Sequence, residues 1–265
     1  MSAQREDTRE LPAFEARSLG TKKHAHALVI PVINEGERIR AQLRRIAEAA
    51  PRVDIVVADG GSTDGSLDDA VLRETGVRAL LVKTGPGKLS AQLRMAYAWC
   101  LDEGYDGIVT IDGNGKDGVE AIDAFVARLE EGYDYVQGSR YKPGGAAVNT
   151  PFDREVAGRL IHAPLISLAG RAWYTDTTNG FRGYSRRYLL DSRVRPFRDA
   201  FDRYQLLFYL SVRAGQLGYR TCEIPVRRAY PAGEPAPTKV SGVKGRFAML
   251  GELFAVVGGR YHPPA

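Results

Sequence analysis

Short apolar runs alternate with amphipathic segments along the first half of the chain. Residues 27–33 (ALVIPVI) are apolar throughout, as expected for a strand buried on both faces of a sheet. Residues 37–50 instead place Ile39, Leu43 and Ile46 at helical intervals with arginines between them. The same patterns predict further strands at 53–58, 79–82, 107–111 and 135–137, and helices at 67–74, 91–100 and 119–131.

This alternation predicts a largely parallel sheet with helices on both faces. The second half is less regular. It predicts helices at 152–173, 188–191, 200–217 and 243–257, a polar loop at 174–184 leading to a short strand, a strand at 219–226, and a loop rich in Pro, Gly and Ala at 229–242. Residues 1–24 carry charges without an apolar core, and we expect a poorly ordered arm there.

Composition and charge narrow the function classes. The 265 residues are 44% hydrophobic and 26% charged, which allows a substantial core. The net charge of +5 is spread along the chain, so it favours acidic ligands or an anionic surface, and no long lysine run indicates nucleic acid. Two cysteines form neither a disulfide framework nor a metal set. With no signal peptide and no apolar stretch long enough to span a membrane, we expect a cytoplasmic protein.

Acidic and amide side chains follow the strand predicted at 107–111. The turn reads DGNGKDG and carries Asp112, Asn114 and Asp117 between glycines. Ligands of open α/β sheets bind where strands end, and such a turn suits a divalent cation that bridges a nucleotide diphosphate. Asp, Asn and Gly are also the commonest turn formers, so this segment taken alone is equally well a plain polar turn.

Four motifs occur in a fixed order, each at the end of a predicted strand or in the turn or loop next to it: PVINE at 31–35, DGGSTDG at 59–65, DGN at 112–114 and DTTNGFR at 176–182. Together they resemble family-2 glycosyltransferases of the GT-A fold, close to the polyprenyl-phosphate branch that includes dolichyl-phosphate-mannose synthases. The resemblance covers roughly residues 26–245. It implies a single α/β domain at 25–265 with a central, mostly parallel mixed sheet flanked by helices. Residues 25–145 would form the nucleotide-sugar half and residues 146–265 the acceptor half.

The resemblance implies inverting transfer of a sugar from a nucleoside diphosphate sugar with Mg²⁺ or Mn²⁺. It places three residues of the first motif beside the nucleoside: Pro31, Asn34 and Glu35. Asp59 would accept a hydrogen bond from the base or, alternatively, serve as an acid at a helix N-terminus. Asp64 would cap and brace its turn. Lys88 either approaches the diphosphate or is a solvated lysine.

At the acidic turn, Asp112 with Gly113 matches the start of the family's Asp-x-Asp motif, so Asp112 is the expected metal ligand and a catalytic residue. Asn114 stands where the second aspartate is usual. An amide oxygen can bind a hard cation but carries no charge, which lowers the expected metal affinity. We expect Asp117 to compensate as a further ligand. Lys116 either contacts a phosphate, and partly replaces the cation, or faces water.

Further arginines match phosphate-binding positions of the family. Arg140, in the GSRY segment, would bind the donor or acceptor phosphate through its planar fork, with Arg154 as a second contact. Surface pairing with nearby carboxylates is the alternative for both. Arg182 would bind phosphate or pair with an internal carboxylate. Arg228 and Lys239 are weaker candidates, because their loop is longer and richer in proline than the resemblance implies.

The acceptor stays open between a polyprenyl phosphate and a soluble hydroxyl compound. Asp176 would be the general base for a hydroxyl, whereas a phosphate is already ionised and would leave Asp176 to orient its loop. The helix at 247–257, preceded by Lys244 and Arg246, either lies on the inner face of the membrane or completes the core. Homo-oligomerisation is also open. A sugar nucleotidyltransferase and a catalytically impaired nucleotide-sugar binding module are the alternative functions.

Overall fold

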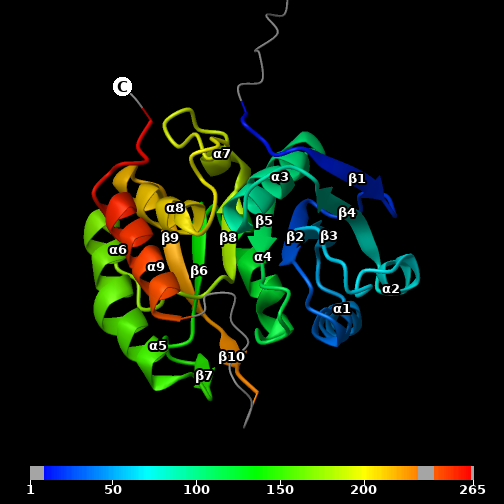
Figure 1. Ribbon diagram of the computed structural model, residues 1–265, viewed down its shortest axis with the longest axis horizontal. Helices are drawn as coiled ribbons and strands as arrows, with labels where there is room; N and C mark the ends of the chain where they lie inside the picture. Colours follow the sequence, from blue (N-terminus) through cyan, green and yellow to red (C-terminus); the bar gives the residue numbers. More distant parts are fainter. Residues whose placement is uncertain (1–8, 232–241, 264–265) are drawn as a thin grey trace, which may run out of the picture.

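An eight-stranded mixed sheet forms the centre of the computed structural model, which describes residues 9–231 and 242–263 (Figure 1). The strand order is β1-β4-β3-β2-β5-β8-β6-β9. The strands are β1 (Phe14–Ser18), β2 (His26–Val32), β3 (Asp54–Asp59), β4 (Val77–Lys83), β5 (Gly107–Thr110), β6 (Tyr135–Ser139), β8 (Arg182–Ser185) and β9 (Thr221–Pro225). A separate parallel pair joins β7 (Ala146–Val148) to β10 (Arg227–Ala229).

Helices pack on both faces of this sheet, as the alternating pattern predicts. They are α1 (Glu37–Ala49), α2 (Asp69–Glu74), α3 (Leu89–Asp102), α4 (Ile122–Glu130), α5 (Phe152–Ala157), α6 (Ala163–Gly170), α7 (Arg186–Leu189), α8 (Gln205–Gln216) and α9 (Gly242–Val257). Strand β2 shows why the run at 27–33 is apolar throughout. Ala27 and Val29 join the core on one face, while Leu28 and Ile30 join the core on the other. Successive side chains of a strand point to opposite faces, so a strand covered on both faces has no polar side.

The chain reverses direction across the sheet at β2. Strands β3 and β4 lie on one side of β2, and β5 returns to pair with β2 on its other side. All of these pairings are parallel, so the carboxyl ends of β2, β3 and β5 lie at one edge. This is the switch point at which α/β sheets bind ligands. Strand β8 is antiparallel to both β5 and β6, which returns the loop at 176–181 to the same edge.

The expectation of a poorly ordered arm at 1–24 is wrong for part of that segment. Residues 14–18 form β1, which pairs antiparallel with β4 at the edge of the sheet. Most of its side chains are exposed, and backbone hydrogen bonds hold it, so it needs no apolar pattern. Residues 1–8 lie outside the described part of the chain.

The long helix expected at 152–173 is divided. A π-helical turn at Gly158–His162 separates α5 from α6, and Pro164 lies in the first turn of α6, where proline is tolerated. Helix α9 does complete the core through Leu253 and Val256, while it also exposes Phe247 and Phe254. Among the residues described, no helix is both long enough and apolar enough to cross a membrane.

Candidate active site

The ends of β2, β3 and β5 meet in one place, as the motifs predict. The N–H of Gly60, after β3, donates to the carbonyl oxygen of Val32 at 2.8 Å. Gly113, after β5, lies so close to β2 that a Cβ built on it would be 2.9 Å from the Pro31 carbonyl oxygen. Only glycine fits this approach without a shift of the backbone. The turns that carry the first three motifs therefore form a single edge.

The first two turns are joined by their own polar side chains. Asn34 has a φ of 49°, a left-handed conformation that asparagine tolerates, and its Oδ1 accepts from the Thr63 N–H at 2.8 Å. Asp59 is 5% exposed, and its Oδ1 accepts from the Ser62 N–H at 2.9 Å and from the Ser62 hydroxyl at 2.6 Å. Asp64 accepts from the Gly36 N–H at 2.8 Å, which confirms its bracing role.

Two buried glutamines hold these turns, and sequence reasoning missed both. Gln42 of α1 donates to the Asp112 carbonyl oxygen at 2.9 Å and accepts from the Gly115 N–H at 2.8 Å. Gln92 of α3 donates to the Val32 carbonyl oxygen at 2.8 Å and also to that of Ala58. Gln42 could have been found, because it falls at helical spacing on the same face as the apolar residues of α1.

The loop before β8 lies against Asp112. A Cβ built on Gly180 would be 2.4 Å from Asp112 Oδ1, so the fourth motif reaches the same site as the third. Arg182 does not line this site, and its expected contact with a phosphate is wrong. Its side chain is 1% exposed and donates to backbone carbonyl oxygens, including those of Thr177 at 2.8 Å and Asn179 at 3.0 Å. Arg182 thus shapes the loop from inside.

Arg140 and Asp176 form a buried ion pair. Arg140 Nε lies 2.6 Å from Asp176 Oδ2, and Nη2 lies 2.9 Å from Oδ1. Burial by itself raises the pKa of Asp176, but the hydrogen bonds and charge of Arg140 outweigh burial and hold the pKa below its usual value. A general base needs the opposite shift. This geometry favours a role for Asp176 in orienting its loop. It also occupies the guanidinium N–H groups through which Arg140 would bind a phosphate.

The loop at 175–178 is also anchored from β9 and from the π-helical turn. Glu223 accepts from the N–H groups of Thr175 at 2.8 Å and Asp176 at 3.1 Å. His162 shares a 2.7 Å hydrogen bond with the Thr177 hydroxyl, and burial lowers the pKa of His162 to about 3, so the imidazole is neutral at pH 7. These contacts make the loop a rigid wall of the site.

The residues of the acidic turn do not fit a ready-made site for a divalent cation. Asp112 Oδ2 accepts from Arg228 Nη2 at 3.0 Å, and Asp117, fully buried, accepts from Arg228 Nη1 at 2.5 Å. Asn114 Oδ1 accepts from the Lys116 N–H at 3.3 Å. Within residues 9–231 and 242–263, no group of three or more His, Cys, Asp or Glu side chains could hold a metal. Arg228 binds Asp117 Oδ2, whereas Asp117 Oδ1 is buried without a hydrogen-bond partner among the described residues, so the expectation that Asp117 joins Asp112 as a metal ligand stays a prediction.

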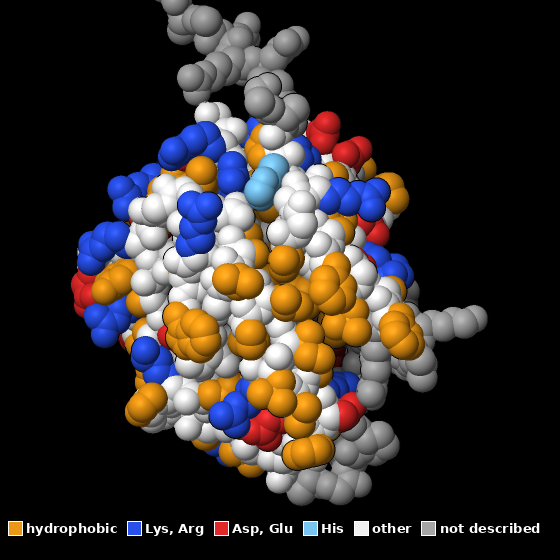
Figure 2. Space-filling model, turned by 90° about the vertical axis from the view of Figure 1, so that its left-hand side faces the viewer, with side chains coloured by type: hydrophobic (Ala, Val, Ile, Leu, Met, Phe, Trp, Pro, Cys, Tyr) orange, Lys and Arg blue, Asp and Glu red, His pale blue; other side chains and the backbone are white. Residues whose placement is uncertain are grey.

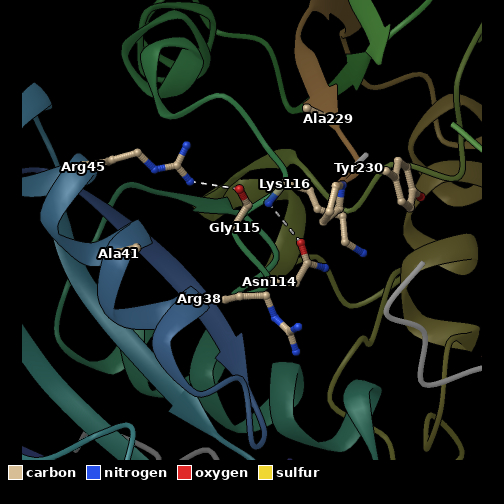
Figure 3. Close-up of a pocket in the computed structure, with 9 residues that line it drawn as sticks. Arg38, Ala41, Arg45, Asn114, Gly115, Lys116, Ala229 and Tyr230 are labelled. Carbon is tan, nitrogen blue, oxygen red and sulfur yellow. Dashed lines mark hydrogen bonds between the residues drawn. The ribbon is translucent and has the colours of Figure 1, made fainter. Parts of the chain in front are cut away.

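A cavity of about 350 Å³ opens beside the acidic turn (Figure 3). It is lined by Arg38, Ala41, Arg45, Asn114, Gly115, Lys116, Ala229, Tyr230 and Pro231. Arg45, from α1, points at the turn and donates to the Gly115 carbonyl oxygen at 2.9 Å. The cavity lies in the size range of small-molecule sites, and its charged lining residues are all cationic.

The remaining residues that the sequence suggests as phosphate contacts do not line this cavity or lie outside the described residues. The Lys88 side chain is exposed at the start of α3, where its N–H donates to Asp202. The Arg154 guanidinium lies 5.9 Å from the centre of the Tyr230 ring. Lys239 and the side chains of Lys244 and Arg246 lie outside the described residues.

The family model for glycosyl transferase family 2 matches residues 27–192. The chain belongs to this family. The match spans β2 to the residues just after α7 and includes all four motifs that meet at the edge described above. This family membership removes the nucleotidyltransferase alternative.

Two relatives of this glycosyltransferase cover most of its length. A polyprenol monophosphomannose synthase of Mycolicibacterium smegmatis is 29% identical over 228 residues, which cover 84% of this chain and 83% of that protein. An undecaprenyl-phosphate mannosyltransferase of Micrococcus luteus is 30% identical over 221 residues, 81% of this chain and 86% of that protein.

A solved structure confirms the expected GT-A fold. Glucosyl-3-phosphoglycerate synthase of Mycobacterium tuberculosis, in complex with Mn²⁺, UDP and glucosyl-3-phosphoglycerate, superposes with a TM-score of 0.62. The superposition covers 91% of this chain and 81% of that one, at 18% sequence identity. At this level of identity the likeness concerns the fold.

The contact between Gly180 and Asp112 leads to a testable prediction. Gly180→Ala places a methyl group 2.4 Å from Asp112 Oδ1, so the carboxylate or the loop has to move. A displacement of about 1 Å at a reacting centre costs about 100-fold in rate, so we expect a loss of that order in sugar transfer. Gly251→Ala in α9, where nothing lies within 4 Å, is the matched control. Equal transfer rates for both variants would show that the Asp112 position is unimportant.

Proposed function

We propose that this glycosyltransferase moves a hexose from a nucleoside diphosphate sugar to the phosphate of a polyprenyl phosphate, with inversion at the anomeric carbon. The buried pair of Arg140 and Asp176 is the observation that carries the choice of acceptor. A hydroxyl acceptor needs a base beside it, and at the position that the family resemblance gives to that base, Arg140 binds both carboxylate oxygens of Asp176 and lowers its pKa, which makes Asp176 a weak base. A phosphate acceptor is ionised already and needs none. Mannose is the sugar in the names of both relatives.

The edge formed by β2, β3 and β5 is where we place the donor. Asn34 and Asp59 lie on the joined turns proposed for the nucleoside, and the Asp112 turn with its cationic cavity is proposed for the diphosphate. An acceptor phosphate oxygen then forms a bond to the anomeric carbon from the opposite face. The bond from that carbon to the diphosphate breaks, and the nucleoside diphosphate leaves with both electrons. Positioning and fixed positive charge supply the protein's share of the rate.

An apolar surface beside the site supports a lipid acceptor. It consists of side chains on α5, the π-helical turn, α6 and its C-terminal end, and α9, each 57% to 81% exposed: Phe152, Leu160, Leu168, Trp173, Phe247 and Phe254. Figure 2 shows hydrophobic side chains spread across the middle of the face on which α6 and α9 lie. Exposed patches of this kind mark binding surfaces. We place the bilayer that holds the polyprenyl phosphate on this face.

Transfer to defined acceptors tests the proposal. The purified full chain would be incubated with UDP-, GDP- and dTDP-hexoses labelled in the sugar and with vesicles that contain undecaprenyl phosphate. We expect label in the lipid extract with one of the nucleotides. Vesicles with undecaprenol, which lacks the phosphate, are the matched control and should accept at least 100-fold less (about 2.7 kcal/mol in the barrier).

Equal transfer to undecaprenol, or transfer only to water-soluble alcohols, would contradict the phosphate acceptor. The pH profile adds an independent readout. Because the pKa of Asp176 is lowered, no loss of rate is expected between about pH 8 and pH 6 from protonation of that group.

A further inference from the structure

Two cations are fixed beside the acidic turn by the fold itself. Arg228 of β10 donates to Asp112 at 3.0 Å and to Asp117 at 2.5 Å, and a β-bridge joins the backbones of residues 117 and 228. Lys116, between the two acids in sequence, is 6% exposed and places its Nζ 4.8 Å from the centre of the Tyr230 ring. Two carboxylates and two fixed cations thus share one turn, with no net charge.

A positive potential acts on the wall of this turn. Burial alone would raise the pKa of Tyr230, but the charge of Arg228, the hydrogen bond from Arg154 and the charge of Lys116 together lower it. The Lys116 pKa is lowered by burial first and by the charge of Arg228 second. Both shifts follow from cations gathered in a partly dehydrated space, which suits an anion.

The cavity next to Tyr230 is also lined by positively charged side chains. Lys116 lines it together with Arg38 and Arg45 of α1, and none of its lining side chains is a carboxylate. Figure 3 shows Arg38 and Lys116 on opposite sides of Asn114, whose amide oxygen accepts from the turn's own backbone. A divalent cation entering here would meet fixed positive charge, a neutral amide, and two carboxylates, Asp112 and Asp117, each of which already has one oxygen bound by Arg228.

We propose that Lys116 and Arg228 take the place of a divalent cation in holding the donor diphosphate at this site. The inference rests on the proposed function, since it assigns the charge partner of the same diphosphate. Two monovalent side chains supply the two positive charges that a metal ion would otherwise bring between the acidic turn and the phosphate oxygens. No metal has to be recruited before the donor binds.

Calorimetric titration of the full chain with UDP and GDP, each in EDTA and again with Mn²⁺, tests the inference. For the nucleotide that binds, we expect the dissociation constant to change less than threefold between the two conditions. A tenfold or larger tightening with Mn²⁺ would overturn the inference while leaving the proposed function intact. If UDP, GDP and dTDP, titrated in the same way, all fail to bind in either condition, the proposed function itself fails.

Lys116→Met removes one of the two charges with little change in volume. We expect nucleotide binding in EDTA to weaken at least tenfold, with the unfolding temperature retained. Lys22→Met, at an exposed lysine remote from the turn, is the matched control and should bind as the wild type does. An unchanged dissociation constant for Lys116→Met would overturn the role of the lysine.

A second variant gives the turn the charges that a divalent cation would require. Asn114→Asp combined with Lys116→Met adds a carboxylate and removes a cation from the same turn. In the presence of nucleotide, we expect this double variant to bind Mn²⁺, seen as loss of the free-ion signal in electron paramagnetic resonance, and the wild type to leave that signal unchanged. One Mn²⁺ bound per wild-type chain would overturn the inference.

Discussion

Asp112→Asn should lower the rate of sugar transfer by about 10²- to 10³-fold, the usual cost of removing one preorganised electrostatic group from an active site. The carboxylate faces the loop at Gly180 and holds Arg228 at 3.0 Å. Asparagine keeps its shape and removes its charge, so the guanidinium loses one of its two anchors. Single-turnover transfer under saturating donor measures the effect.

The fold should survive this change. The Asp112 side chain is 29% exposed, and Arg228 retains its bond to the buried Asp117. Asp106→Asn, at an exposed acid just before β5, is the matched control and should transfer as the wild type does. If Asp112→Asn keeps more than a tenth of the wild-type rate with an unchanged melting curve, Asp112 is not part of the chemistry.

Asp176→Asn should lower the free energy of unfolding by about 3–5 kcal/mol, because it leaves the charge of Arg140 buried without its partner. Arg140 and Asp176 are 6% and 2% exposed, and two hydrogen bonds of 2.6 and 2.9 Å join them. Urea denaturation of wild type and variant at pH 7 gives this difference directly.

The pH dependence of that difference has a definite sign. The pKa of Asp176 is lowered in the folded state, so its contribution is present above the unfolded value of about 3.9 and is lost as pH falls through the folded value. The gap between wild type and Asp176→Asn should therefore be constant from pH 8 to pH 5. It should begin to narrow only below about pH 4.

An exposed ion pair provides the control for this experiment. Glu155 and Arg159 lie 3.2 Å apart on the surface, with side chains 35% and 54% exposed. Water and salt screen such pairs, so Glu155→Gln should change the unfolding free energy by no more than about 0.5 kcal/mol. If both variants lose equally little, Arg140 and Asp176 are not coupled in the way that their geometry indicates.

Local patterns predicted the edge of the sheet that carries the site. Residues 27–33 and 107–111 are apolar because both faces of a parallel sheet are covered, and polar turns have to follow where strands leave the core. In a parallel sheet these turns all emerge at one edge. The convergence of Asn34, Asp59 and Asp112 therefore follows from strand order and alternation, before any side-chain contact is known.

The edge strand β1 was missed for a related reason. It is held by backbone pairing with β4, and of its side chains only Phe14 packs against the core, so Phe14–Ser18 shows no apolar alternation. A pattern of hydrophobic positions reflects the burial of side chains. A strand that buries few side chains therefore shows no such pattern in the sequence.

The sequence by itself determined the alternation of strands and helices from β2 to β6, the turns that carry polar groups, and the family to which they belong, because periodicity and turn chemistry are local properties of the chain. Only the tertiary structure decided the partners of the arginines. Arg140 meets Asp176 across 36 residues, and Arg228 meets Asp117 across 111 residues. A guanidinium suits a carboxylate, a carbonyl or a phosphate equally well by type, so which of them it binds depends on what the fold places within 3 Å.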